Sequence, residues 1–327
     1  MGNDITKPLE NEENTDPKNS GYHAGFVALI GQPNVGKSTL MNRILGVDLA
    51  IITAKPQTTR NRILGVRSFP EKGQIAFVDT PGIHRSKKQL NKRMVATALA
   101  AITEVDLICH VIDADAYIKQ MARLGKDEIP ASEAFIFRKL AEVEQPVFLI
   151  LNKVDKLDAK EQLLPLILDL SARFDFAEIL PVSAQKGDNI RRLVEVILEH
   201  LPESDPLFPE DMLTDQAERF IAAEFIREQV LEQTHEEVPY SVAVEIERFV
   251  DNRDKNMIEV SAIIHVERTS QKGIVIGKGG ARLQSIGTKS RKRMQAFFGK
   301  KIYLETFVRV ESEWSEDPEA LGRFGYE

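Results

Sequence analysis

Hydrophobic residues form short continuous runs along the first two thirds of the chain. The run Phe26–Ile30 is apolar at every position, which is typical of a strand buried on both faces of a sheet. Similar runs recur downstream, separated by longer stretches with the spacing of amphipathic helices. The other predicted strands are 75–78, 107–112, 147–151 and 178–182, and the predicted helices are 38–45, 86–103, 131–144, 159–174 and 189–200. This alternation predicts an α/β domain with a doubly wound, mainly parallel sheet.

Three prolines between Pro202 and Pro209 interrupt this alternation and indicate a linker between domains. Beyond them the pattern changes to a long helix, two strands of alternating polarity, two short helices and a last strand. The predicted ranges are, in order, 213–234, 241–250, 257–267, 279–287, 289–298 and 302–310. The order α-β-β-α-α-β predicts a smaller α+β domain. We therefore expect the first domain over 23–203, and the linker helix with the second domain over 204–311.

Charge is distributed unevenly along the chain. The net charge of -7 argues weakly against a nucleic-acid partner, yet residues 268–301 contain ten Lys or Arg and no acidic residue. Acidic segments at both ends hide this basic stretch in the average. Residues 1–22 are expected to form a disordered acidic leader, and residues 312–327 an acidic C-terminal tail. The distribution favours a negatively charged partner for the second domain.

Targeting features point to the cytoplasm. No apolar run approaches the roughly 18 residues of a membrane span. The N-terminus lacks the apolar core of a secretion signal. The single cysteine, Cys109, lies in an apolar run and cannot form an internal disulfide, which fits a reducing compartment. We expect a cytoplasmic protein.

A glycine-rich loop joins the first predicted strand to the first predicted helix. Its sequence is Gly31-Gln32-Pro33-Asn34-Val35-Gly36-Lys37-Ser38, followed by Thr39. The glycines let the backbone curl so that successive N–H groups face phosphate oxygens, and the helix N-terminus adds positive potential. Lys37 is predicted to reach the β- and γ-phosphates, and Ser38 to bind Mg²⁺. An ordinary glycine turn is the alternative, which the flanking strand and helix disfavour.

A second motif, Asp79-Thr80-Pro81-Gly82-Ile83, follows the strand predicted over 75–78. Asp79 can hold Mg²⁺ through water, and the Gly82 N–H can contact the γ-phosphate. The sequence Asp-Thr-Pro-Gly is also compatible with a plain turn. Its place at a strand end, after a phosphate loop, favours a nucleotide switch. The adjacent His84 is more simply a surface histidine than a base.

A third motif selects the base of the nucleotide. The sequence Asn152-Lys153-Val154-Asp155 follows the strand predicted over 147–151. The Asp155 carboxylate can accept hydrogen bonds from the guanine N1–H and the exocyclic amine, whereas adenine has no donor at N1. Lys153 is expected to pack along the base, and Ser183-Ala184 to supply an N–H for the guanine carbonyl. Together with the phosphate motifs, this predicts binding of GTP and GDP.

The loop between the first two motifs is expected to respond to the γ-phosphate. A threonine hydroxyl in it can complete the Mg²⁺ shell, and we favour Thr59 over Thr58. Many GTPases place a water-orienting glutamine where this chain has Ile83, so we expect slow intrinsic hydrolysis or help from another group. Asn34 is a candidate for coordinating K⁺ beside the phosphates. The predicted catalytic set comprises Lys37, Thr59, Asp79, Gly82 and Asn34.

The basic stretch carries a second glycine motif, Gly277-Lys278-Gly279-Gly280, at the junction of two helices. Glycines permit close approach of a sugar-phosphate backbone, and the helix N-terminus and Lys278 favour its charge. Apolar positions such as Ile276, Leu283 and Ile286 can line a groove for bases. With the α-β-β-α-α-β order, this predicts a type II KH domain that prefers single-stranded RNA. The predicted RNA-binding residues are Gly277, Lys278, Gly279, Gly280, Arg282, Lys289, Arg291, Lys292 and Arg293.

These motifs together resemble the Era family, bacterial GTPases with a C-terminal KH domain. The resemblance covers nearly all of the chain from Gly25 to Tyr326. Its carriers are Gly31–Ser38, Pro56–Arg60, Asp79–Ile83, Asn152–Asp155, Glu218–Phe220, Glu237–Ser241, Gly273–Gly280, Gly299–Lys301 and Leu321–Tyr326. The chain departs from the family in its acidic leader and in a longer segment over 114–134. Neither departure touches a motif.

The resemblance implies binding near the 3′ end of small-subunit (16S) ribosomal RNA and a role in maturing that subunit, coupled to cell growth and division. It implies RNA affinities that differ between the GTP and GDP states, and a monomer able to associate peripherally with the inner face of the cell membrane. Two alternatives remain. One is a membrane-associated signalling GTPase whose KH-like domain is structural. The other is a GTP-powered enzyme, which the lack of a further catalytic motif in the sequence disfavours.

Overall fold

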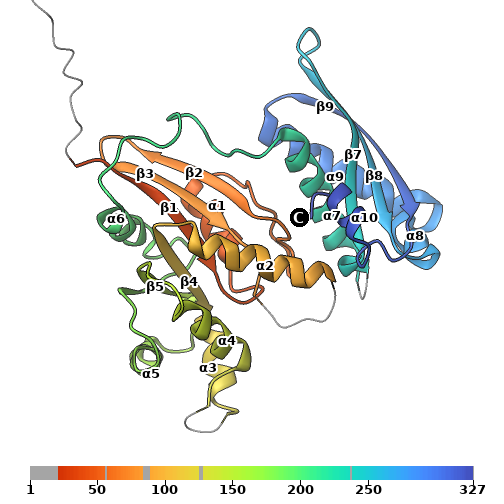
Figure 1. Cartoon of the computed structure of the whole chain (residues 1–327). Helices are drawn as coiled ribbons and strands as arrows, with labels where there is room; N and C mark the ends of the chain where they lie inside the picture. Colours follow the sequence, from red (N-terminus) through yellow and green to blue (C-terminus); the bar gives the residue numbers. More distant parts are fainter. Residues whose placement is uncertain (1–20, 56, 84–88, 125–127, 236–237, 327) are drawn as a thin grey trace, which may run out of the picture.

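Two domains lie side by side in the computed structural model (Figure 1). The structure describes residues 21–326, except residues 56, 84–88, 125–127 and 236–237. Most of the predicted leader, and His84, therefore lie outside the described residues. The linker predicted around the prolines runs along the first domain, where Phe208 N donates to Gln74 Oε1 at 2.9 Å.

The first domain is built on a six-stranded sheet with the order β2-β3-β1-β4-β5-β6. Its strands are β1 His23–Ile30, β2 Ile63–Phe69, β3 Gly73–Asp79, β4 Leu107–Asp113, β5 Val147–Asn152 and β6 Glu178–Pro181. All neighbours pair in parallel except β2, which is antiparallel to β3. The mainly parallel sheet was predicted, but β2 was not.

Helices cover both faces of this sheet. They are α1 Lys37–Leu45, α2 Gln89–Thr103, α3 Ala114–Met121, α4 Ala131–Leu140, α5 Leu163–Ser171 and α6 Ile190–His200. Successive residues of β5 point to opposite faces, so Phe148 joins the core beneath α1 and α6 while Leu149 joins the core beneath α2 to α5. The two separate cores confirm the doubly wound α/β architecture, and α3 is a helix that the sequence pattern did not predict.

The second domain packs two long helices on a three-stranded sheet. Its elements are α7 Glu218–Gln233, β7 Val242–Asn252, β8 Met257–Val266, α8 Thr269–Ile276, α9 Ala281–Phe298 and β9 Lys301–Val310. The sheet order is β7-β8-β9, with β7 antiparallel and β9 parallel to β8. This is the predicted α-β-β-α-α-β order.

Two helices of the second domain differ from their predicted ranges. The pattern predicted short helices over 279–287 and 289–298, whereas α9 is one continuous helix and α8 lies before the glycine motif. The predicted break fell at residue 288, directly after Gly287, a residue type that weakens isolated helices. In the fold, a Cβ at Gly287 would meet only the Thr306 hydroxyl at 3.8 Å, and packing of α9 on α7 and β9 sustains the helix.

The C-terminal segment, which composition set apart as an acidic tail, is folded onto both domains. It contains the helix α10, Pro318–Arg323. Trp314 and Leu321 are fully buried, in a cluster with Met94 of α2 and Ala243 of β7. The segment therefore exposes acidic side chains to solvent, while its apolar side chains pack between the first and second domains.

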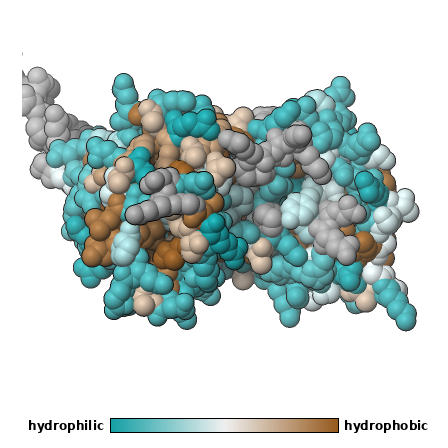
Figure 2. Space-filling view, turned by 90° about the horizontal axis from the view of Figure 1, so that it is seen from below, coloured by the Kyte–Doolittle hydropathy of each residue, from teal (hydrophilic) through white to brown (hydrophobic). Residues whose placement is uncertain are grey.

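The surface is mainly hydrophilic, with hydrophobic patches over the first domain on the face seen from below (Figure 2). On α5, the side chains of Leu164 and Leu168 are each 63% exposed. Among the helices that the structure describes, none is both long and apolar enough to cross a membrane.

Candidate nucleotide site and basic face

The glycine-rich loop lies between β1 and α1 and requires its glycines for steric reasons. Gly31 has φ 146°, and a Cβ there would lie 2.3 Å from the Val111 carbonyl oxygen. Gly36 has φ 100°, and its Cβ would lie 2.3 Å from the Asn152 amide nitrogen. Side chains at these positions would collide with the ends of β4 and β5. The loop is therefore held directly against the edge where the parallel strands end, the usual place for ligands in such sheets.

Lys37 begins α1 and is turned back over the loop. Its Nζ donates to the carbonyl oxygens of Gly31 at 3.2 Å and Gln32 at 3.1 Å. Burial lowers the pKa of this ammonium to about 8, while the carboxylates of Asp79 and Glu133 oppose the shift. Anionic phosphates beside Lys37 would favour its charged form further.

Three predicted metal-site residues from different segments converge. Ser38 Oγ donates to Asp79 Oδ2 at 2.6 Å and lies 2.9 Å from Thr59 Oγ1, which is itself 3.3 Å from Asp79 Oδ2. The other carboxylate oxygen of Asp79 is buried and has no hydrogen-bond partner among the described residues. Burial raises the pKa of Asp79, against the effect of Lys37 and of both hydroxyls. Two hydroxyls and a carboxylate form an all-oxygen donor set that fits Mg²⁺.

Thr58 points away from this cluster. Its hydroxyl donates to the Lys55 carbonyl at 2.7 Å and lies 2.8 Å from the Thr53 hydroxyl. Of the two threonines, only Thr59 therefore places its hydroxyl beside Ser38 and Asp79.

The predicted base-binding residues gather at the ends of β5 and β6. Asn152 donates to the Val35 carbonyl at 2.8 Å and accepts from the Ala184 N–H at 3.0 Å, which ties the phosphate loop to the last strand. Ser183 Oγ donates to Asp155 Oδ1 at 2.6 Å, so the carboxylate has a fixed orientation. Val154 begins a 3₁₀ turn that carries Asp155.

Lys153 has a partner that the sequence analysis missed. Its Nζ donates to Asp113 Oδ2 at 2.7 Å and to the Asn34 carbonyl at 2.5 Å. Asp113 ends β4, and its other oxygen caps α3 through the Ala116 N–H at 3.1 Å. A carboxylate directly after a predicted buried strand was the available signal, since parallel strands end at one edge.

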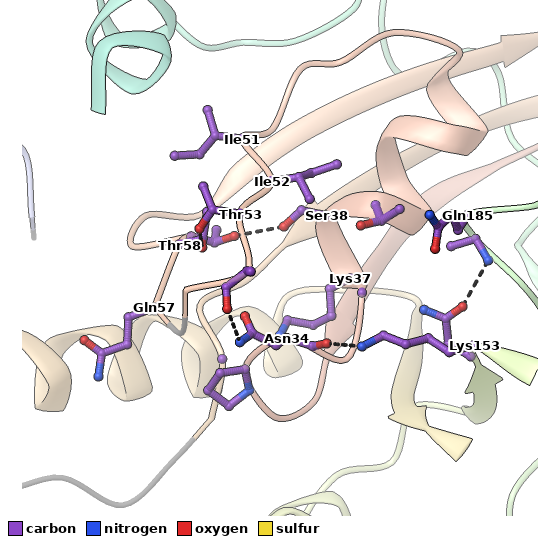
Figure 3. Close-up of a pocket in the computed structure, with 18 of the residues that line it drawn as sticks. Asn34, Lys37, Ser38, Ile51, Ile52, Thr53, Gln57, Thr58, Lys153 and Gln185 are labelled. Carbon is purple, nitrogen blue, oxygen red and sulfur yellow. Dashed lines mark hydrogen bonds between the residues drawn. The ribbon is translucent and has the colours of Figure 1, made fainter. Parts of the chain in front are cut away.

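A cavity of about 540 Å³ connects these groups (Figure 3). Its lining includes Asn34, Lys37 and Ser38 from the phosphate loop, and Lys153 and Gln185 from the base-binding edge. Thr59 and Gly82 also line it. The cavity therefore joins the predicted phosphate, metal and base positions.

Two residues were connected with hydrolysis on sequence grounds. Ile83 is buried and its N–H donates to the Gly31 carbonyl at 3.0 Å, so an apolar, enclosed side chain occupies the position of the usual glutamine. Asn34 is exposed, with φ 64°, and its amide donates to the Ala54 carbonyl at 3.1 Å. That bond joins the phosphate loop to the segment before Thr59.

Arg60, next to Thr59, reaches into the second domain. It is 3% exposed and donates to the carbonyls of Val242 at 2.7 Å and Pro239 at 3.0 Å. Its guanidinium lies 5.9 Å from the Trp314 ring centroid and 5.5 Å from that of Tyr326. The loop that carries Thr59 is thereby anchored in the second domain and in the C-terminal segment.

A second contact reaches the same loop from α7. Arg227 donates to the Thr58 carbonyl, and its guanidinium is paired with Glu224 at 2.6 Å. Arg227 is fully buried, so removal of Glu224 would leave an uncompensated charge in the interface. Neither this pair nor the Arg60 contacts could be read from local sequence.

The second glycine motif joins α8 to α9 and lies beside a groove. Gly277 has φ 73°, and a Cβ there would be 2.8 Å from the Arg282 Cβ. Lys278, Lys289, Arg291 and Lys292 are exposed. The groove, of about 380 Å³, runs between α9 and β9 and is lined by Gly280, Leu283, Gln284, Gly287, Thr288, Arg291, Leu304 and Thr306.

Two predicted members of this surface lie elsewhere. Ile286 is fully buried in the domain core and does not line the groove. Arg293 lies at the boundary between the domains, 2.7 Å from Glu228 of α7 and 3.4 Å from Asp48 of the first domain, and its guanidinium stacks over Phe225 of α7 at 4.6 Å. Helical geometry explains both errors, because residues two positions apart on α9 face different sides. We therefore assign Arg293 to the domain interface and remove it from the proposed RNA-binding set.

The arrangement defines the class of the chain, a P-loop GTPase followed by a KH domain. Comparison with protein families agrees with both halves. The family model described as 50S ribosome-binding GTPase matches residues 26–153, and the KH domain model matches residues 237–315.

The chain belongs to the Era family of GTPases. GTPase Era of Geotalea daltonii is 51% identical over 307 residues, which cover 94% of this chain and 98% of the relative. GTPase Era of Syntrophus aciditrophicus is 48% identical, covering 95% and 99%. A solved structure of Era with MgGDPNP and nucleotides 1506–1542 of 16S ribosomal RNA superposes with a TM-score of 0.87 at 40% identity, covering 93% of this chain and 99% of that chain. An Era variant of Aquifex aeolicus bound to GDP.AlF4- gives the same values.

Proposed function

We propose that this GTPase is a nucleotide-controlled RNA-binding protein that acts on the 3′ region of small-subunit ribosomal RNA during maturation of that subunit. The observation that carries the proposal is the direct connection between Thr59, at the phosphate end of the cavity, and Arg60, in the domain interface. The related Era structure that holds 16S nucleotides also holds a GTP analogue. GTP would thus favour the RNA-binding arrangement.

The division of labour follows the domains. We propose residues 23–203 as the GTP-binding unit and 204–311 as the RNA-binding unit. The predicted phosphate, base and Thr59 residues form the first site, with Asp113 added through Lys153. Residues 312–326 connect the two units through the cluster around Trp314.

Mg²⁺ is the metal that the first site would hold. Ser38 and Thr59 would supply hydroxyl oxygens, and Asp79 would act through water. When bound, the ion neutralises charge on the β- and γ-phosphates. Lys37 would place a second positive charge at the same oxygens, and Asp155 would fix the base so that the γ-phosphate lies at the loop.

We separately propose that K⁺ bound beside Asn34 assists hydrolysis, because Ile83 occupies the position where many GTPases have a water-orienting glutamine. The buried Ile83 supports a need for another group, and Asn34 lies at the mouth of the cavity. Hydrolysis should then be faster in K⁺ than in Na⁺, and Asn34→Ala should remove the difference. Equal rates in both salts would reject this assignment.

RNA is proposed to bind along the glycine motif and the groove between α9 and β9. Exposed cations at Lys278, Lys289, Arg291 and Lys292 would contact phosphates, and the groove would accept unstacked bases. Such binding weakens as salt rises, because phosphate contacts release counterions.

The test is the double variant Lys278→Asp with Lys289→Asp, assayed against an RNA of the 16S 3′ end. We expect RNA affinity to fall by at least about tenfold with GTP hydrolysis unchanged. A matched control replaces Lys72 and Lys160, both exposed on the first domain, and should bind RNA normally. Unchanged RNA affinity in the first variant would reject the proposed RNA-binding surface around Lys278 and Lys289. It would favour a KH-like domain with a structural role.

A further inference from the structure

A buried polar chain lies behind the phosphate loop, on the side of the sheet covered by α4. Gln32, in the loop, donates its side-chain amide to Glu133 Oε1 at 2.6 Å. The other oxygen of Glu133 lies 3.0 Å from His110 Nε2. His110 is on β4 and Glu133 is in the first turn of α4, so three segments meet at this carboxylate.

Glu133 and His110 are 1% and 0% exposed, so neither group is satisfied by bulk water. The His110 nitrogen lies close to this carboxylate oxygen without the alignment of a hydrogen bond. The N-terminus of α4 adds positive potential at Glu133. Burying a carboxylate is costly without such support, and the strong bond from Gln32 is therefore the directional contact of this group.

This series of polar contacts continues into the nucleotide site through the backbone of Gln32. The Gln32 carbonyl is one of two that accept from Lys37 Nζ, the other being that of Gly31. The Gly31 carbonyl also accepts from the Ile83 N–H at 3.0 Å, which holds this acceptor in place. Gln32 is fixed on its side-chain end by Glu133, so displacement of Glu133 moves one of the two acceptors that aim Lys37.

We infer that Glu133, supported by His110, is a positioning residue for GTP hydrolysis, because through Gln32 it sets the direction of the Lys37 ammonium. A group that acts in this way changes the rate with bound GTP as well as the stability of the fold. Small displacements of a charge from its required place cost rate steeply.

The test is single-turnover hydrolysis at saturating GTP, in the absence of RNA, for Gln32→Ala, Glu133→Ala and the double variant. We expect each single change to slow hydrolysis by about tenfold. The double variant should be no slower than either single variant, because both changes interrupt the same series of contacts. Glu133→Gln keeps an acceptor for Gln32 and should stay within about twofold of the wild type.

A matched control is Glu142→Ala, which removes an exposed carboxylate just after α4 that pairs with Lys139, and it should hydrolyse GTP at the wild-type rate. Wild-type rates for Gln32→Ala, or losses that multiply in the double variant, would overturn the inference. A lowered melting temperature with an unchanged rate would show a structural role alone. If Glu133→Ala does not fold, the two single variants Gln32→Ala and Glu133→Gln test the inference between them. Gln32→Ala should hydrolyse GTP slowly, and Glu133→Gln should not. RNA binding plays no part in this assay, so its outcome is independent of the proposed RNA function.

Discussion

The nucleotide site and the basic face are built in opposite ways. Around the cavity, the buried residues Lys37, Asp79 and Asn152 are held by contacts with the glycine-rich loop and the start of α1. On the basic face, Lys278 and Lys289 are exposed side chains on one short stretch of chain. The first arrangement presents fixed dipoles and charges to a reacting phosphate. The second offers solvent-exposed charge to a polyanion, for which the number and sign of the charges matter more than their exact placement.

The largest effect should come from the fixed site. Lys37→Ala removes the buried ammonium aimed along the loop, and we expect single-turnover hydrolysis to fall by about a hundredfold or more. RNA binding by the protein without nucleotide should be retained. Loss of RNA binding in that state would contradict the separation of the two sites.

The next effect concerns the base. Asp155→Asn replaces an acceptor with a group that presents a donor to guanine, so GTP affinity should fall by about a hundredfold. Binding titrations with labelled GDP measure this directly. Asp158→Asn, an exposed carboxylate in the same region, is the control. If both changes are equally harmless, Asp155 does not read the base.

A smaller effect is expected on the basic face. Lys289→Ala should lower RNA affinity only a few-fold and reduce the slope of log affinity against log salt by about one. Arg293→Ala should leave that slope unchanged, because Arg293 pairs with Glu228 in the interface. Equal slopes for the two variants would show that Arg293 contacts RNA as Lys289 does.

The smallest effect is expected from a conservative substitution at Arg60, which connects the nucleotide site to the second domain. Arg60→Lys keeps the charge but loses the fork that reaches Val242 and Pro239 together. We expect a loss of stability of about 1–3 kcal/mol and a reduced difference in RNA affinity between nucleotide states. Arg62→Lys, at an exposed pair with Glu104, is the matched control. Identical behaviour of the two variants would rule out coupling through Arg60.

Much of the fold followed from hydrophobic periodicity, because β1, β3, β4 and β5 are buried on both faces and appear as unbroken apolar runs. β2 was missed, since Gly65 interrupts its pattern and its end is exposed. The nucleotide motifs were visible because steric and phosphate contacts confine those residue types to adjacent positions. Arg60 and Glu133 were not identified as structural links, since their partners lie in distant segments and only folding brings them together.

RNA affinity in two nucleotide states tests the central claim most directly. The dissociation constant for an RNA of the 16S 3′ end should be measured with a non-hydrolysable GTP analogue and with GDP. Linkage through the loop of Thr59 and Arg60 predicts tighter binding with the GTP analogue, by about tenfold within the usual range of coupling. Equal affinities in the two states would contradict control of the RNA face by the nucleotide site.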